Sequence, residues 1–137
     1  MGKYFTIKEM CSSNTARVKR IENVPNKEQE KNLEALIDNI LDPLRETYGK
    51  PINVSSGFRS YHLNKAVGGA ANSQHTLGQA ADIYCTNKQD NKKLFDLIQS
   101  LNLPFDQVIW EKGNDSYPDW VHVSYSSRNR RQVLRIK

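Results

Sequence analysis

The stretch SQHTLGQAADIYC, residues 73–85, combines a turn, a strand and two candidate ligands. Gly78 lets the backbone turn, and the run Ala80–Cys85 predicts a short strand. His75 and Asp82 lie seven positions apart on either side of that glycine. A turn at this point can therefore bring an imidazole and a carboxylate close together.

A third candidate ligand, His122, lies in the segment Val121-His122-Val123-Ser124. Side chains alternate along a strand, so the two valines would face one side and His122 and Ser124 the other. Two imidazoles and a carboxylate are a donor set that zinc uses in hydrolases, with one position left for water. Spacing alone is a weak signal, because surface histidines and hydrogen-bonded core histidines also fit it.

Outside this region, periodic apolar residues predict helices. Thr6 and Glu9 have the capping-box spacing and predict a short helix that starts there. Leu, Ile and Tyr recur at three- and four-residue spacing over residues 33–48, which predicts an amphipathic helix ending at Gly49. Pro43 falls inside this pattern and predicts a kink near residues 39–40, or a break. A second amphipathic helix is expected over residues 87–101.

Short apolar segments predict the strands, at Ile52–Ser55, Ala80–Cys85, Gln107–Trp110, Val121–Tyr125 and Val133–Ile136. The stretch 57–69 is expected to be a loop with one helical turn. Helices that precede and interrupt the strands, joined by tight turns, predict an α+β fold with a small, mostly antiparallel sheet packed against helices. Residues 1–137 are expected to form a single domain.

Composition excludes several classes of protein. The 137 residues contain no apolar stretch long enough to span a bilayer, and two cysteines are too few for a disulfide scaffold. The N-terminus shows no apolar signal region. Lys and Arg number 20 against 15 Asp and Glu, giving a net charge of +5. This basic balance alone is compatible with nucleic acid, with an anionic cell-wall polymer or with simple solubility.

Three elements in order resemble the M15 family of zinc peptidases, which includes D-Ala-D-Ala carboxypeptidases and phage L-alanyl-D-glutamate endolysins. They are SGFRS at 56–60, the S-x-H-x-x-G-x-A-x-D pattern at 73–82, and D-x-x-H at 119–122. The resemblance implies a hedgehog/DD-peptidase-like fold and a single M15-like peptidase domain. It also implies a Zn²⁺ ion bound by His75, Asp82 and His122.

The same resemblance implies roles for residues around the metal. Arg59 would face the substrate, where it would pair with a peptide carboxylate or stabilise the oxyanion of the tetrahedral intermediate. Ser73 lies where the family has a serine that contacts substrate or supports a ligand. A turn serine bonded to its own backbone is an equally good interpretation of Ser73.

The general base has two candidates. Asp119, three residues before His122, falls where the family places a carboxylate that takes a proton from the attacking water. In a regular strand Asp119 would point away from His122, so this assignment requires the strand to begin after Asp119. Glu111, at the end of the strand predicted over 107–110, is the rival. The sequence favours Asp119.

The predicted function is a zinc-dependent metallopeptidase that hydrolyses peptidoglycan stem-peptide bonds involving D-amino acids, as a D-Ala-D-Ala carboxypeptidase or an L-Ala-D-Glu endopeptidase. The alternative is a non-catalytic, zinc-containing wall-binding or structural module, because hedgehog signalling domains share this architecture. A monomer is expected, with no nucleic-acid or membrane partner. The lack of a visible signal peptide suggests a cytoplasmic protein released as a phage or prophage lysin, or one carried on a virion.

Overall fold

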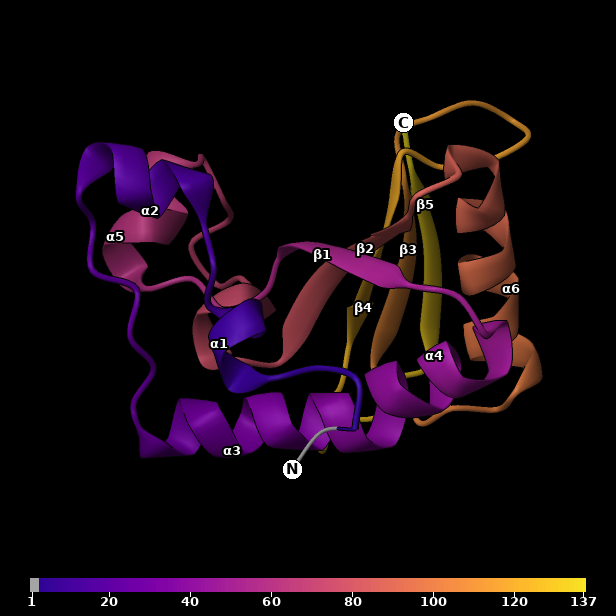
Figure 1. The fold of residues 1–137 in the computed structure, drawn as a ribbon, viewed down its shortest axis with the longest axis horizontal. Helices are drawn as coiled ribbons and strands as arrows, with labels where there is room; N and C mark the ends of the chain where they lie inside the picture. The colour runs from indigo at the N-terminus through magenta and orange to yellow at the C-terminus, as the bar shows by residue number, and fades with distance from the viewer. Residues whose placement is uncertain (1–2) are drawn as a thin grey trace.

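A computed structural model describes residues 3–137 and confirms the α+β prediction (Figure 1). Its sheet has the strand order β1-β2-β4-β3-β5. The pairs β1–β2, β2–β4 and β4–β3 are antiparallel, and the pair β3–β5 is parallel. The strands are β1 (Ile52–Ser56), β2 (Ala80–Cys85), β3 (Gln107–Glu111), β4 (Trp120–Ser124) and β5 (Gln132–Ile136). None of the helices in residues 3–137 is long and apolar enough to cross a membrane.

Residues 3–137 also form six α-helices and three short turns of other helix types. The α-helices are α1 (Ile7–Met10), α2 (Asn14–Lys19), α3 (Lys27–Leu36), α4 (Asp42–Tyr48), α5 (Tyr61–Ala66) and α6 (Asn91–Ser100). The short turns are η1 (Ile37–Leu41), η2 (Gln74–Leu77) and η3 (Lys88–Asp90). Figure 1 shows α6 alongside the sheet and α3 and α4 beneath it, with α2 and α5 grouped at the far end.

The long amphipathic segment forms as predicted, and Pro43 perturbs it in a specific way. Asn26 and Gln29 cap the start of α3 reciprocally, and Gly49 ends α4 with a φ of 79°. Between α3 and α4 the chain forms the π-type turn η1. Proline has no N–H to bond the carbonyl four residues earlier, at Asn39, so the helix widens by one residue there.

Cross-strand register decides which side chains share a face of the sheet. Asp82 of β2 lies directly opposite His122 of β4, and Ile109 of β3 lies opposite His122 on the other side. Directly opposed residues project to the same face. Val121 and Val123 project to the other face, where they are fully buried in the core. The alternation predicted for this strand is therefore confirmed.

The structure adds one helix that was not predicted and lengthens an expected helical turn. Helix α2 was not predicted, although Ser13 caps it by accepting a hydrogen bond from the Ala16 N–H. Its six residues carry too few apolar side chains to produce a helical stripe. The expected helical turn within residues 57–69 is the six-residue helix α5, capped by Ser60.

The turn η2 is docked closely against α3. The side chain of Gln29 donates to the carbonyl of Thr76 at 3.0 Å, and that of Asn32 donates to the carbonyl of Leu77 at 2.8 Å. Gly78 ends η2 with a φ of +74°, and a Cβ added there would lie 2.5 Å from the Gln29 carbonyl oxygen. Only glycine permits both this backbone angle and this close approach.

We predict that Gly78→Ala destabilises the protein more than Gly68→Ala does. Gly68 has nearly the same φ, +73°, but within the described residues nothing lies within 4 Å of its added Cβ. Gly68→Ala should cost about 1–2 kcal/mol for the left-handed backbone. Gly78→Ala should cost about 1–3 kcal/mol more, because the backbone of α3 or η2 must move. Urea denaturation of both variants measures the difference, and equal costs would show that the packing of η2 on α3 is loose.

Candidate metal centre

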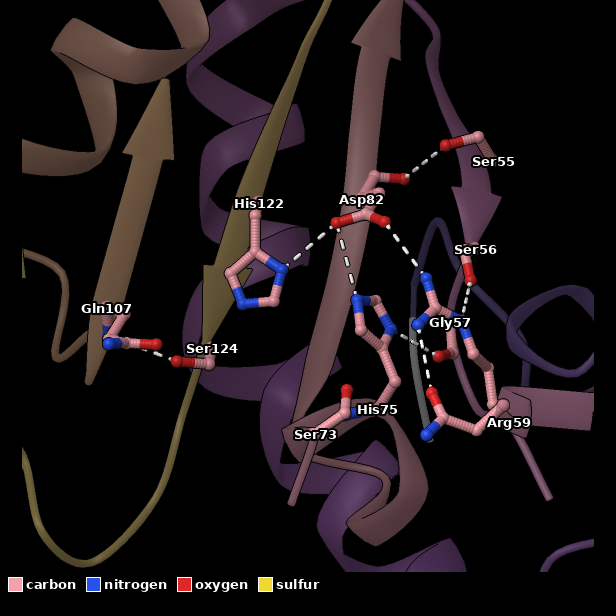
Figure 2. Close-up of polar contacts among 11 residues, drawn as sticks. Ser55, Ser56, Gly57, Arg59, Ser73, His75, Asp82, Gln107, His122 and Ser124 are labelled. Atoms are coloured by element: carbon pink, nitrogen blue, oxygen red, sulfur yellow. Dashed lines mark hydrogen bonds and ion pairs between the residues drawn. The ribbon is translucent and has the colours of Figure 1, made fainter. Parts of the chain in front are cut away.

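His75, Asp82 and His122 converge in the structure although they come from three different elements. One ligand atom from each lies within 4.8 Å of the others. His75 comes from η2, Asp82 from the middle of β2 and His122 from the middle of β4 (Figure 2). His75 and Asp82 are buried, and His122 is half-buried. The grouping of three donors predicted from the sequence is thus present in space.

The ring of His75 is oriented by backbone groups. Its Nδ1 lies 2.7 Å from the carbonyl oxygen of Gly57. A carbonyl can only accept, so Nδ1 carries the proton and Nε2 keeps its lone pair. Nε2 lies 3.4 Å from Oδ1 of Asp82, facing the rest of the cluster. At the start of η2, Oγ of Ser73 accepts from the His75 N–H at 3.2 Å, so Ser73 caps the turn that carries the ligand.

The two oxygens of Asp82 have separate partners. Oδ1 lies 3.0 Å from Nδ1 of His122, while Oδ2 lies 3.5 Å from the guanidinium of Arg59 (Figure 2). Burial by itself would raise the pKa of Asp82, but its contacts with His122 and His75 hold that pKa well below its usual range. Asp82 is therefore a carboxylate, with one oxygen directed at the histidines and one at Arg59.

This donor set fits a divalent metal ion. Catalytic zinc sites take three protein ligands from His and carboxylate groups and leave a further position for water or substrate. The His75 ring also makes the hydrogen bond through its other nitrogen that metal-binding histidines commonly make. The residues present therefore fit a catalytic zinc site in ligand type and number.

Arg59 is held in place by three polar contacts. Its Nε donates to Oγ of Ser56 at 2.9 Å, one terminal nitrogen donates to Oδ1 of Asn64 at 3.2 Å, and the other faces Asp82. The side chain of Arg59 is only 16% exposed. Asn64, on α5, was not identified from the sequence, because it acts by holding Arg59 and no sequence pattern marks such a residue.

The cluster lies in a cavity of about 490 Å³, which Arg59, Ser73 and Glu111 also line. Glu111 lies opposite Trp120 in the β3–β4 pairing, so it projects to the same face as His122. Burial, followed by the negative charge of Asp82, raises the pKa of Glu111. The third histidine, His62, is exposed on α5 and lines a different surface pocket.

The structure places Asp119 elsewhere. Strand β4 does begin after Asp119, as the base assignment requires. The Asp119 carboxylate, however, forms an ion pair with Lys88 at 2.6 Å and lines a separate cavity beside residues 112–115. Its hydrogen bond with Lys88 lowers the pKa of Asp119. Of the two candidate bases, Glu111 shares the cavity with the cluster.

Comparison with known proteins agrees with this geometry. A family described as Peptidase M15 matches residues 3–124, a range that includes all three candidate ligands. A 44-residue segment, 31% of the chain, is 52% identical to a zinc D-Ala-D-Ala carboxypeptidase from Streptomyces albus G. That segment covers 17% of the length of the Streptomyces protein. Because the family match extends over most of its length, this chain belongs to the Peptidase M15 family.

Proposed function

We propose that this peptidase is zinc-dependent and hydrolyses a peptidoglycan stem-peptide bond involving a D-amino acid, D-Ala-D-Ala or L-Ala-D-Glu. The observation that carries the proposal is the convergence of His75, Asp82 and His122 in a cavity that also contains a carboxylate, Glu111, and a cation, Arg59. The name of the Streptomyces relative supports zinc and the D-Ala-D-Ala bond.

We propose His75, Asp82 and His122 as the zinc ligands. When bound, zinc would acidify a water molecule and polarise the substrate carbonyl. The chain contributes two neutral imidazoles and one negative charge, so the bound centre would keep a charge near +1. Burial restricts the movement of His75 and Asp82, and the Gly57 carbonyl fixes the tautomer of His75.

We propose Glu111, in preference to Asp119, as the general base. Glu111 lines the cavity of the ligands, and its raised pKa keeps the carboxylate a better proton acceptor than an ordinary glutamate. In this role it takes a proton from the attacking water and returns it to the leaving amine. The Asp119 carboxylate forms an ion pair with Lys88, which lowers its pKa and makes it a weaker base.

Arg59 is proposed to stabilise the negative charge that develops on the substrate carbonyl oxygen. A fixed guanidinium costs little reorganisation when charge appears beside it. Its contacts with Ser56, Asn64 and Asp82 provide that fixation. Ser73 lines the same cavity, which supports a role in contacting the substrate. Its Oγ accepts a hydrogen bond from the His75 N–H, which supports a second role in positioning that ligand.

Removal of either histidine ligand should abolish metal binding. We expect His75→Ala and His122→Ala to bring zinc content and muropeptide hydrolysis below about a tenth of the unmodified protein, because two ligands do not hold the ion. His62→Ala, which removes the exposed histidine on α5, is the matched control and should change neither. Zinc is measured by mass spectrometry of the metal, and hydrolysis by mass spectrometry of defined muropeptides. Full zinc occupancy in both ligand variants would refute the site.

Substitution of the two candidate bases separates them. We expect Glu111→Gln to lower kcat about 10²- to 10⁴-fold while zinc content stays unchanged, because a proton acceptor is lost and no ligand is removed. Asp119→Asn breaks only a surface ion pair and should change kcat less than about threefold. The reverse pattern would identify Asp119 as the base. Loss of zinc from Asp119→Asn would make that residue a ligand.

A further inference from the structure

Three arginines line the cavity of the metal cluster, and their charges are balanced to different degrees. Arg59, Arg128 and Arg130 all contribute to its wall. Arg59 faces the carboxylate of Asp82, as described above. The other two belong to the loop between β4 and β5, and a single buried carboxylate, that of Asp106, lies beside both.

Arg130 satisfies the carboxylate of Asp106. Its Nε donates to Oδ1 at 3.0 Å and a terminal nitrogen donates to Oδ2 at 2.9 Å, a bidentate pair. The backbone N–H of Arg130 also donates to Oδ1, at 2.9 Å. Asp106 is completely buried, and the hydrogen bond from Arg130 holds its pKa well below the usual range. The two charges therefore neutralise each other.

Arg128 is left without such a partner. Its guanidinium approaches Asp106 only to 3.8 Å, beyond hydrogen-bond distance, and its side chain is 58% exposed. Of the carboxylates that line the cavity, Asp82 faces Arg59 and the histidines, and Glu111 has the proposed role of accepting a proton. Among the described residues that line this wall, Arg128 is thus a cation whose donors remain available to a ligand.

Asp106 also connects the loop that carries Arg128 to the turn that carries His75. The side chain of Gln74 donates to Oδ2 of Asp106 at 2.9 Å, and Gln74 is the residue directly before His75. On the other side, the Gln132 N–H donates to the Asp106 carbonyl at 2.9 Å. Asp106 therefore links the loop that carries Arg128 to η2 through its side chain, and its backbone carbonyl binds the start of β5.

We propose that Arg128 binds a carboxylate of the peptide substrate and so selects anionic peptides. This inference rests on the proposed function and adds a residue that would distinguish charged from uncharged substrates. A partly exposed guanidinium beside a metal centre can pair with a carboxylate without the cost of burying an isolated charge. The carboxylate has two sources in a stem peptide: the C-terminal group of D-Ala-D-Ala, or the free carboxyl of D-Glu.

Two pairs of peptides distinguish these sources. The first pair is an N-acetylated peptide ending in D-Ala-D-Ala and its C-terminal amide. The second is an L-Ala-D-Glu peptide and the analogue in which the free D-Glu carboxyl is an amide. Binding is measured by titration calorimetry on zinc-loaded Glu111→Gln protein, in which the peptides stay intact, with and without Arg128→Gln. Lys137→Gln, at an exposed position outside this cavity, controls for the loss of one positive charge.

We expect Arg128→Gln to weaken binding of the acid in one pair about 5- to 50-fold, and binding of its amide less than about twofold. The affected pair identifies the source of the carboxylate. Equal losses for acid and amide, an equal effect of Lys137→Gln, unchanged affinity, or no binding of either acid would each overturn the proposal.

Hydrolysis by protein with Glu111 intact is measured in parallel. If acids bind selectively through Arg128 but no peptide is cleaved, the proposed peptidase function on these bonds fails and the carboxylate site stands. If peptides are cleaved while Arg128→Gln affects acid and amide alike, the function stands and the carboxylate site fails.

Discussion

The pairing of β2 with β4 is the constraint on which the site depends. In the observed register Asp82 lies directly opposite His122. A slip of one residue would turn every side chain of one strand to the opposite face and bury His122 where Val121 and Val123 now lie. The same pairing buries Ala81, Ile83 and the two valines in the core. Hydrophobic burial therefore enforces the register that brings the carboxylate and the imidazole together.

The candidate ligand His75 reaches the sheet through the turn η2, which is held on two sides. Gln29 and Asn32 of α3 bond the carbonyls of η2, and the Gly57 carbonyl bonds the His75 ring. A Cβ on Gly57 would lie 2.3 Å from the Met10 carbonyl oxygen, so β1 and α1 also approach each other closely here. Helix α3, the end of β1 and the turn η2 thus form one packed unit, and this unit holds His75 in the candidate metal site.

Local patterns predicted those parts of the structure that depend on nearby residues. The stripe over residues 33–48 and the valine alternation around His122 act over short distances, and they are found in the structure as helices and a strand. The three-element motif spans residues 56–122, and it was its resemblance to a known family, not a local pattern, that predicted the cluster. Which carboxylate lines the cavity of the cluster depends on a cross-strand neighbour instead. Glu111 is eleven residues from His122 in sequence, yet the β3–β4 register turns both to one face. Sequence proximity favoured Asp119, whose partner Lys88 lies in a different element.

The arginines of the C-terminal loop show why a count of charges does not predict recognition. The excess of positive charge in this region is visible in the sequence. The pairing of Arg130 with the buried carboxylate of Asp106 is not visible there, because Asp106 lies 24 residues away along the chain. Burying Asp106 without a partner would be strongly unfavourable, so its bidentate pair with Arg130 fixes the loop rather than leaving that cation for a ligand. In the folded chain Arg130 therefore holds the loop, whereas Arg128 lines the cavity without a hydrogen bond to Asp106.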